Sequence, residues 1–523
     1  MIMAMASRLQ LLVGGIPLVG GVLLRPVRPL GSGGGCLAFS RKISCWHGSH
    51  FHMDFFSLAH PIHSMSRSVH VCAACCDSST PSSSTSISQL EAQESPHQEV
   101  SPITGEYSPI TWELWRRRSY AQKPLSENAQ KVPHGVELKP KTPAQSRTSI
   151  TYALSTDSFL RAQYGSPFGH VRIARLLEDL DSLAGNIAFA HVDDDDPSTI
   201  EPTLVTASVD SIRVKRRLSL NDDIVLSGEV THVGRSSLEI SMRIEESDKK
   251  KPPAVQARFT FVARDRETGK AAPVPGLLPE TEEEKRAFAA GDARAVARKQ
   301  ARSIKPMHQE MSDEEAQLVA DLLKESKVLM EMPAHAPGDV MLARATRQEN
   351  LFMTQPQQRN MNGRVFGGFL MRRAFELAYA TAFSFCGMPP RFLEVGEVTF
   401  KQPVSVGELL SLRAEIRASV DRSELSESLA TAYSRAAGCG PGLSAVMQVD
   451  VSALVTDPPM RTAALSNTFV FRFGVDAHDA DAAADDSSSS SPVMRAGLKR
   501  VLPAKESEAV AQARALLSLT DER

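Results

Sequence analysis

The sequence predicts an α+β fold made of two consecutive units of similar design. An apolar stripe at helical spacing is followed by several alternating, β-branched runs, and this order occurs twice, roughly 195 residues apart. One helix and one antiparallel meander can cover each other's apolar faces, so each sheet is expected to wrap around its helix. Two such units are expected to pair with their helices antiparallel.

The composition excludes several classes of protein. The chain has 523 residues, 42% hydrophobic and 23% charged, close to the average of globular proteins. Its formal net charge of −2 argues against binding nucleic acid through overall charge. No apolar run reaches about 18 residues, so no integral membrane span is expected. Most of the seven cysteines precede residue 77, and the later Cys386 and Cys439 are expected in the core and in a loop, so a disulfide scaffold is excluded.

The first 76 residues have the composition of an organelle transit peptide. They are basic and rich in Ser and Gly, and Asp54 is the first acidic residue. The apolar run 11–24 makes a secretory signal the alternative, but the acid-free stretch continues well beyond it. Cys72, Cys75 and Cys76 are too crowded for a zinc site, so no metal is expected. Residues 77–147 are expected to be a linker, mostly disordered.

The first unit is expected over 148–268. Apolar residues at helical spacing predict a helix over 170–187, and alternating runs predict strands over 203–214, 223–233, 237–244 and 254–264. A helical connector is expected over 269–338, because Thr281 with Glu284 and Ser312 with Glu315 form capping-box patterns.

The second unit is expected over 339–475. It begins with a helix over 369–383, followed by strands over 393–400, 409–418, 425–437 and 443–456. The end of the chain, 476–523, is expected to be a disordered acidic and Ser-rich segment closed by a helix over 506–519.

Three motifs make the sequence resemble a known family. The run 360–371, NMNGRVFGGFLM, resembles the N-x-N-G-x-x-F-G-G opening of hotdog-fold acyl-coenzyme A thioesterases, and 398–407, VTFKQPVSVG, resembles their following strand and turn. The run 232–237, HVGRSS, resembles their V-G-R-S-S turn. With LLEDLDSL at 176–183, these motifs are similar to the mitochondrial double-hotdog members, over roughly 150–265 and 340–460.

The resemblance implies tandem hotdog domains, each a long helix wrapped by an antiparallel sheet, paired as a double hotdog. It implies hydrolysis of fatty acyl-coenzyme A to free fatty acid and coenzyme A, without a cofactor. It also implies a homo-oligomer, a trimer of double hotdogs, in the mitochondrial matrix, with the chloroplast as the alternative location.

The resemblance further implies a catalytic pair, an Asn in the loop before one helix and a carboxylate in the helix of the partner unit. Within a family repeat the Asn precedes the carboxylate by fifteen residues. Counted from Asn360, this spacing reaches Phe375; counted back from Asp181, it reaches Ser166. One composite site with Asp181 and Asn360 is therefore expected, and the other pseudo-equivalent site should be inactive. Asn360 would orient the attacking water, whereas Asn362 is expected to be a turn residue.

Asp181 has two rivals on the same predicted helix. At about 100° per residue, Asp181 lies about 90° from the centre of the apolar stripe, Asp179 about 110° away on the other side, and Glu178 about 150° away. This geometry disfavours Glu178 and separates the two aspartates only slightly. The resemblance makes Asp181 the general base or the nucleophile, and the sequence does not choose between these roles.

Gly367 and Gly368 stand at the predicted start of the second helix, where the first unit has residues 172–174, Arg-Ile-Ala. They are needed either for close backbone packing or for N–H groups that polarise the thioester carbonyl as an oxyanion hole. Glu376 is the only acid beside the vacant carboxylate position and is expected to be solvated.

Coenzyme A contacts are expected at Arg235, with Ser236 and Ser237 nearby; the alternative is a basic residue of a strand turn. The basic run 215–217 is expected to be solvated rather than to bind coenzyme A. Two other functions stay open. One is a catalytically silent acyl-coenzyme A sensor or scaffold; the other is a hotdog hydratase or dehydratase, which would need a His that 360–379 lacks.

Overall fold

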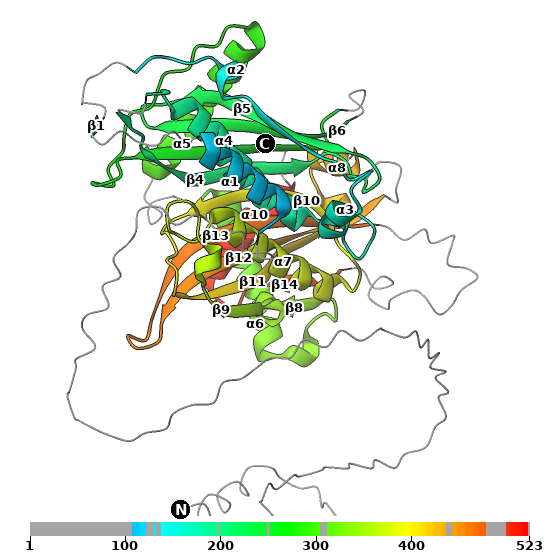
Figure 1. Cartoon of the computed structure of the whole chain (residues 1–523). Coiled ribbons are helices and arrows are strands. Elements are labelled where there is room, and N and C mark those ends of the chain that lie inside the picture. Colours follow the sequence, from blue (N-terminus) through cyan, green and yellow to red (C-terminus); the bar gives the residue numbers. More distant parts are fainter. Residues whose placement is uncertain are drawn as a thin grey trace, which may run out of the picture. The chain divides into compact units, whose positions relative to one another are not determined.

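A computed structural model describes residues 107–121, 130–131, 138–196, 199–247, 252–303, 311–435, 442–476 and 498–520 (Figure 1). The expected transit peptide, Cys439 and most of the acidic segment after Asp476 lie outside these residues.

The centre of the fold is one ten-stranded sheet in the order β2-β5-β6-β7-β4-β10-β13-β12-β11-β9. Every neighbouring pair in it is antiparallel. The first unit contributes β2 (Thr148–Tyr152), β4 (Thr203–Val214), β5 (Ile224–Val233), β6 (Ser237–Glu246) and β7 (Val255–Arg264). The second contributes β9 (Gln348–Met353), β10 (Arg391–Phe400), β11 (Leu409–Asp421), β12 (Leu443–Asp457) and β13 (Thr462–Asp476).

The strand order in one half of the sheet is the reverse of that in the other half, as a pseudo-twofold axis between them requires. β4 and β10 each follow the long helix of their unit and pair with each other at the centre, with Val209 opposite Val398. The outermost strands, β2 and β9, each precede the helix of their unit. This arrangement confirms the predicted tandem hotdog pairing.

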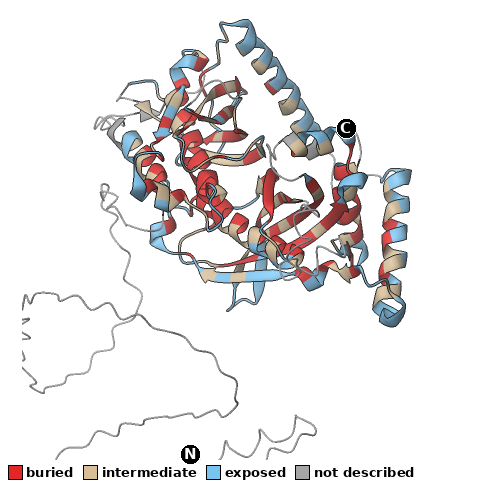
Figure 2. Ribbon diagram, turned by 90° about the vertical axis from the view of Figure 1, so that its right-hand side faces the viewer, coloured by how far each residue is buried: buried red, intermediate tan, exposed pale blue. Residues whose placement is uncertain are grey.

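The long helices are α4 (Ile173–Val192) and α7 (Gly367–Cys386), and each packs on its own half of the sheet. They cross antiparallel: Arg172 at the start of α4 pairs with Glu376, whereas Glu178, further along α4, pairs with Arg372, nearer the start of α7. Figure 2 shows buried residues concentrated along these helices and the inner strands. One apolar core runs through both units and includes the expected core residue Cys386.

Helix α1 (Pro109–Ala121) lies within the segment expected to be a linker, and it packs against α4. Ile110, Leu114 and Trp115 are buried in the main core. The spacing of these three residues is helical, but the stripe is short and its surroundings are polar and Pro-rich, which obscured the pattern.

Residues 427–435 correct one strand prediction. The expected strand over 425–437 is instead helix α8 (Glu427–Arg435). Leu425, Leu429 and Tyr433 recur every four residues, and they pack in a small core with Val420 and Leu519. Four-residue spacing places these side chains on one helical face, whereas a strand needs a period of two.

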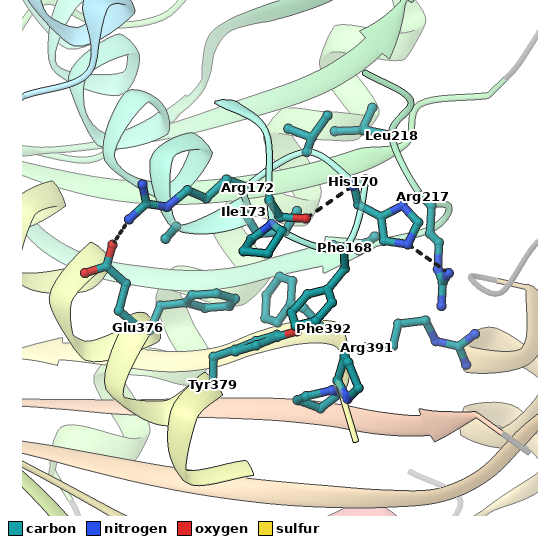
Figure 3. A pocket seen from close by; sticks show the side chains of 18 of the residues that line it. Phe168, His170, Arg172, Ile173, Arg217, Leu218, Glu376, Tyr379, Arg391 and Phe392 are labelled. Carbon is teal, nitrogen blue, oxygen red and sulfur yellow. Dashed lines mark hydrogen bonds and ion pairs between the residues drawn. The ribbon is translucent and has the colours of Figure 1, made fainter. Parts of the chain in front are cut away.

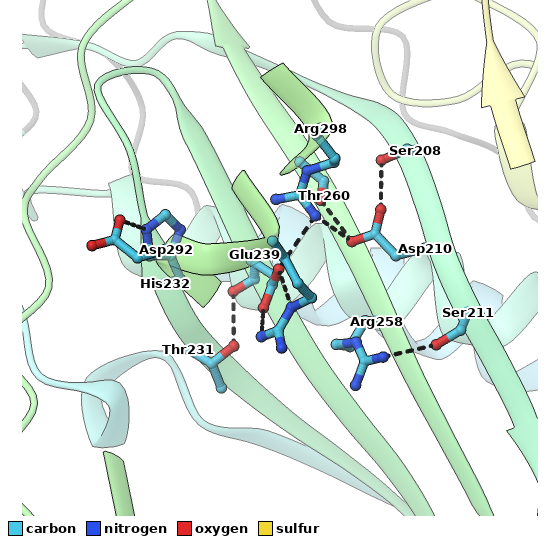
Figure 4. A network of polar contacts seen from close by, with 11 residues as sticks. Ser208, Asp210, Ser211, Thr231, His232, Glu239, Arg258, Thr260, Asp292 and Arg298 are labelled. Carbon is cyan, nitrogen blue, oxygen red and sulfur yellow. Dashed lines mark hydrogen bonds and ion pairs between the residues drawn. The ribbon is translucent and has the colours of Figure 1, made fainter. Parts of the chain in front are cut away.

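The connector between the units contains α5 (Glu282–Ser303) and α6 (Asp313–Glu331). Two ion pairs and one hydrogen bond hold α5 on the sheet. Arg294 pairs with buried Glu239 at 2.5 Å and Arg298 with Asp210 at 2.8 Å, and Asp292 lies 3.0 Å from His232 Nε2 at hydrogen-bond distance (Figure 4). Charged contacts therefore act beside the ring contact of Phe288 with His232 on this face of the sheet.

The remaining elements are short or peripheral. The helices are α2 (Pro143–Ser146), α3 (Ser158–Tyr164) and α10 (Glu506–Thr520), with 3-10 turns at Pro333–His335, Ala343–Thr346, Pro356–Gln358 and Arg422–Glu424. The strands are β1 (Gln130–Lys131), β3 (Thr199–Ile200), β8 (Val340–Leu342) and β14 (Arg500–Leu502). α10 packs with α6 in a separate small core. Within the described ranges, no helix combines the length and apolar character that a membrane crossing requires.

Candidate active site

Asp181 lies in α4 of the first unit, but its carboxylate faces the start of α7 in the second. The side chain is buried, with 3% of the residue exposed. Oδ1 accepts a hydrogen bond from Thr206 Oγ1 of β4 at 2.9 Å, and the Gly368 backbone N–H also donates to the carboxylate. A Cβ atom on Gly367 would lie only 3.0 Å from Asp181 Oδ2. The acid of one unit and the glycines of the other thus meet directly.

Burial raises the pKa of Asp181 to about 6, while the hydrogen bonds from Thr206 and Gly368 act in the opposite direction. The carboxyl group is therefore mostly ionised at neutral pH and more basic than an ordinary aspartate. Both properties suit a group that takes a proton from water.

Gly367 and Gly368 form the first turn of α7. The N-cap residue is Phe366, whose side chain makes no capping hydrogen bond, and the Gly368 N–H of this turn donates to Asp181. A Cβ on Gly368 would lie 2.9 Å from the Glu178 carbonyl oxygen of α4. Gly368 therefore serves the close helix crossing, and the packing role expected from the sequence is present beside the electrostatic one.

Asn360 lies in the loop before α7 and is half-buried. Its Oδ1 accepts hydrogen bonds from the backbone N–H groups of Asn362, at 2.9 Å, and Arg364, at 3.2 Å, which closes a turn around Gly363 at φ 76°. Asn362 is a turn residue as expected, and its Nδ2 also donates to the Leu204 carbonyl of β4 at 3.3 Å.

Within the described residues, Asn360 and Asp181 share no direct hydrogen bond. They are connected through β4, because Leu204 binds the Asn360 turn and Thr206, two residues on, binds Asp181. The structure thus brings Asp181, Gly367 and Gly368 into contact, whereas the Asn360 turn is linked to Asp181 through the segment of β4 from Leu204 to Thr206.

The rival Glu178 is fully buried, although its helical angle predicted an exposed side chain. It lies between Arg372, at 2.9 Å, and Arg175, at 3.5 Å. Burial raises the pKa of Glu178 to about 7, while Arg372 favours the charged form. This residue joins the two helices at their crossing.

The rival Asp179 is also fully buried. Its carboxylate accepts hydrogen bonds from four hydroxyl groups, those of Ser108, Thr111, Tyr152 and Tyr164. Burial raises the pKa of Asp179, and these hydroxyls oppose that shift. All its acceptor positions are occupied by the protein, which favours a structural role.

The positions of Glu178 and Asp179 follow from the neighbours of α4. The helix contacts the sheet, α7 and α1, so it is enclosed on three sides. The hydrophobic stripe marks only the side toward the sheet, and the polar side is covered by α1 and by α7. A largely buried helix that carries three carboxylates must have polar partners for them, but periodicity alone does not identify these partners.

Arg235 and Ser236 lie in the turn between β5 and β6, and Ser237 is the first residue of β6; Arg235 is exposed. Ser237 pairs with Val262 of β7, and Leu204 of β4 pairs with Ala263. The turn is therefore at the same end of the sheet as the Asn360 loop, and two strand spacings, roughly 10 Å, separate β6 from β4.

The pseudo-equivalent position in α7 is occupied by Phe375, which is buried among the aromatic rings of Tyr379, Phe392, Phe471 and Phe473. The neighbouring Glu376 is not solvated as expected. It is half-buried and pairs with Arg172 at 2.5 Å and Arg373 at 3.3 Å, because the start of α4 brings a cation to it.

In the basic run 215–217, Lys215 and Arg217 are exposed as expected, and Arg216 departs from the expectation of a solvated segment. Arg216 is largely buried and pairs with Glu246 at 2.5 Å, and Arg217 pairs with Asp476 at 2.6 Å. The described residues contain no cluster of His, Cys, Asp and Glu arranged to hold a metal ion.

Comparisons with known proteins agree with this architecture. Residues 168–252 match the family model described as "Thioesterase superfamily". The chain is 44% identical over 374 residues to "Acyl-coenzyme A thioesterase 2, chloroplastic" of Humulus lupulus, covering 71% of this chain and 81% of that protein. It is 41% identical over 404 residues to "Acyl-coenzyme A thioesterase 4, mitochondrial" of the same plant, covering 76% and 73%. "Acyl-coenzyme A thioesterase 9, mitochondrial" of Mus musculus is 34% identical over 285 residues, covering 53% and 65%.

Proposed function

This chain belongs to the acyl-coenzyme A thioesterase family, and from this premise we propose that it hydrolyses fatty acyl-coenzyme A at one composite site. The site lies between Asp181 of α4 and the first turn of α7. One observation carries the proposal: a buried carboxylate of the first unit accepts a hydrogen bond from the glycine turn of the second.

The chemistry follows from these groups. Asp181, ionised above about pH 6, takes a proton from a water molecule as the water oxygen attacks the thioester carbon. The N–H groups at the start of α7 stabilise the negative charge that develops on the carbonyl oxygen. The intermediate collapses as the C–S bond breaks, and the proton passes from Asp181 to the coenzyme A thiolate.

Direct attack by Asp181 on the thioester is the second version of this step. It requires a mixed anhydride between Asp181 and the acyl group, which water would then hydrolyse. Rapid acid quenching under single-turnover conditions, followed by mass spectrometry of the protein, distinguishes the two versions, because only the anhydride route leaves the acyl group on Asp181.

Asn360 is proposed to orient the water or the thioester. Its Oδ1 holds the turn, so its Nδ2 group is the end that donates. Substrate would have to enter between this turn and Asp181, and Asn362 fixes the distance by holding the turn on β4.

Arg235 is proposed to bind a phosphate group of coenzyme A. Its exposure at the end of the sheet near the Asn360 loop supports this role. Arg235→Ala is expected to raise KM for acyl-coenzyme A with little change in kcat, because a phosphate contact is made equally in the ground and transition states.

Assembly and location are proposed at two levels. The chain is expected to form a homo-oligomer, a trimer by family resemblance; exposed Leu351 and Met353 on the edge strand β9 support a contact between copies. Light scattering of the purified chain tests the oligomeric state.

Import into an organelle, the mitochondrial matrix or the chloroplast, is proposed from the basic leader and from the relatives' names. Expression of residues 1–100 fused to a fluorescent protein tests import.

The central test measures thiol release from a series of acyl-coenzyme A esters by the parent, Asp181→Asn and Asn360→Ala. Asp222→Asn, an exposed change in the turn after β4, is the matched control. The composite site predicts loss of most activity in Asp181→Asn with an unchanged fold and an unaffected control. Full activity in Asp181→Asn would refute the assignment, and binding without turnover in the parent would indicate a silent acyl-coenzyme A sensor.

A further inference from the structure

A cavity of about 440 Å³ lies where the pseudo-twofold axis places the second, inactive site (Figure 3). Its walls include Ile173 and Ala174 at the start of α4 and Phe375 and Glu376 on α7. The first turn of α4 lacks the two glycines, and Phe375 stands where the second unit would need an acid. The site has thus lost its reacting groups but not its space, and its volume is in the range of small-molecule sites.

The middle of the cavity is aromatic. Phe168, Phe375, Tyr379 and Phe392 line it, and their rings contact one another, with 5.0 Å between the centroids of Phe375 and Phe392. Phe168 is 41% exposed. Such a lining suits an alkyl chain, which gains free energy by leaving water.

The charges at the two sides of the cavity are not equal. On one side Arg172 and Glu376 pair at 2.5 Å and balance each other. On the other side Arg217 and Arg391 both pair with Asp476, at 2.6 and 2.8 Å. Figure 3 shows His170 and Arg217 in contact on this side, with Arg391 nearby. Two guanidinium groups therefore share one carboxylate.

Arg391 adds a specific indication of an anionic ligand. Only 7% of the residue is exposed, and its Nε and Nη2 atoms have no hydrogen-bond partner in the described part of the chain. Leaving buried N–H groups of a cation without acceptors costs free energy. A carboxylate can accept hydrogen bonds from both nitrogens of a guanidinium edge. Both atoms are covered by neighbouring groups, so a carboxylate that binds them must move this cover aside.

We infer that this cavity binds a free fatty acid, with its carboxylate on Arg391 and Arg217 and its alkyl chain against the aromatic rings. A fatty acid is an apolar chain that ends in one anion, and it is also the product of the proposed hydrolysis. The identity of the ligand therefore rests on the proposed function. The inactive half of the molecule thus holds a product-binding site separate from Asp181.

The test titrates octanoate into the full chain by calorimetry, with octanol and coenzyme A as comparison ligands. Ile173→Trp fills the cavity without touching the charged side, and Arg391→Gln removes the buried cation. Phe400→Trp is the matched bulky change at the proposed active site, because Phe400 lies beside Gly367 and Asp181. Thiol release from octanoyl-coenzyme A is measured on the same preparations.

We expect octanoate to bind the parent and Phe400→Trp equally. Its binding to Ile173→Trp, where the space is filled, and to Arg391→Gln, where a hydrogen-bonded charge is lost, should be weaker by about tenfold or more. Octanol should bind the parent weakly, and Ile173→Trp should still hydrolyse octanoyl-coenzyme A. The inference is overturned if octanoate does not bind, if only Phe400→Trp reduces its binding, or if coenzyme A alone competes for the cavity. Octanoate binding with this pattern in a chain without hydrolysis would refute the proposed function and leave the fatty-acid site standing.

Discussion

Thr206→Val is expected to move the acid limb of the pH–rate profile. Valine keeps the shape of threonine but removes the hydroxyl that donates to Asp181 Oδ1 at 2.9 Å. That bond stabilises the ionised carboxylate, so its loss raises the pKa of Asp181 further. A hydrogen bond to a charged group contributes about 1.5–3 kcal/mol, and one pKa unit corresponds to about 1.4 kcal/mol, so a shift of about one unit is expected.

The consequence for the rate follows from the ionised fraction. With a pKa of about 6, half of the Asp181 side chains are ionised at pH 6. With a pKa of about 7, roughly one in eleven is ionised, so kcat/KM at pH 6 should lie about elevenfold below the plateau of the variant, compared with about twofold in the parent. Relative to the parent at pH 6, this is a loss of about fivefold. The alkaline plateau should stay within about twofold of the parent, because the base is fully ionised in both proteins there.

The assay is thiol release between pH 5 and pH 9, read with a pyridyl disulfide reagent whose response does not depend on pH over this range. The profile of kcat/KM reports the free enzyme, which is the state that the structure describes. Thr151→Val, an exposed change on β2, is the matched control. An acid limb that stays at the same pH in Thr206→Val, or is absent from the parent, would refute the role of Asp181 as base.

Three further predictions concern stability. Asp181→Asn should stabilise the fold at pH 8 by up to about 3 kcal/mol, because the pKa of the Asp181 carboxyl rises from 3.8 to about 6 on folding. The folded parent loses stability as the pH rises between these two values, and this loss is complete above about pH 6. Denaturant unfolding should therefore show the variant to be more stable at about pH 8 and no more stable than the parent below about pH 4. Asp179→Ala should destabilise the chain by about 3 kcal/mol or more, because four buried hydroxyls lose their acceptor; a loss below about 1 kcal/mol would contradict a structural role. Gly368→Ala should cost about 1–3 kcal/mol in thermal unfolding and abolish activity, since its Cβ would press on the Glu178 carbonyl, whereas Gly338→Ala, where the added methyl meets open space, should do neither.

The fold was predictable because its strands and central helices repeat a clear period. The strand expected over 203–214 has the same limits as β4, and the mirrored strand order follows from two copies of one design. The strand predicted over 425–437 is wrong because an apolar residue every four positions, with alternation in between, fits a helix as well, and the structure has α8 there.

The site was predictable only in part. Motif resemblance pointed to Asp181 and the glycines, which the structure brings together, but it gave no information on Thr206, which comes from a strand with an ordinary β pattern. The burial of Glu178 and Asp179 was not predictable from the α4 sequence, since it depends on α1 and α7, which cover the polar side of that helix. The cavity at Phe375 requires residues from both units and has no local signature.

The continuous sheet across β4 and β10 has a consequence for how such a molecule diversifies. In a symmetric homodimer every substitution appears twice, so the loss of an acid removes both copies of a site. In a tandem chain each change appears once. Asp181 can therefore be kept while Phe375 occupies the corresponding position in the other half. The two halves can change independently, as two separate genes would, while the shared sheet holds them in a fixed relative position.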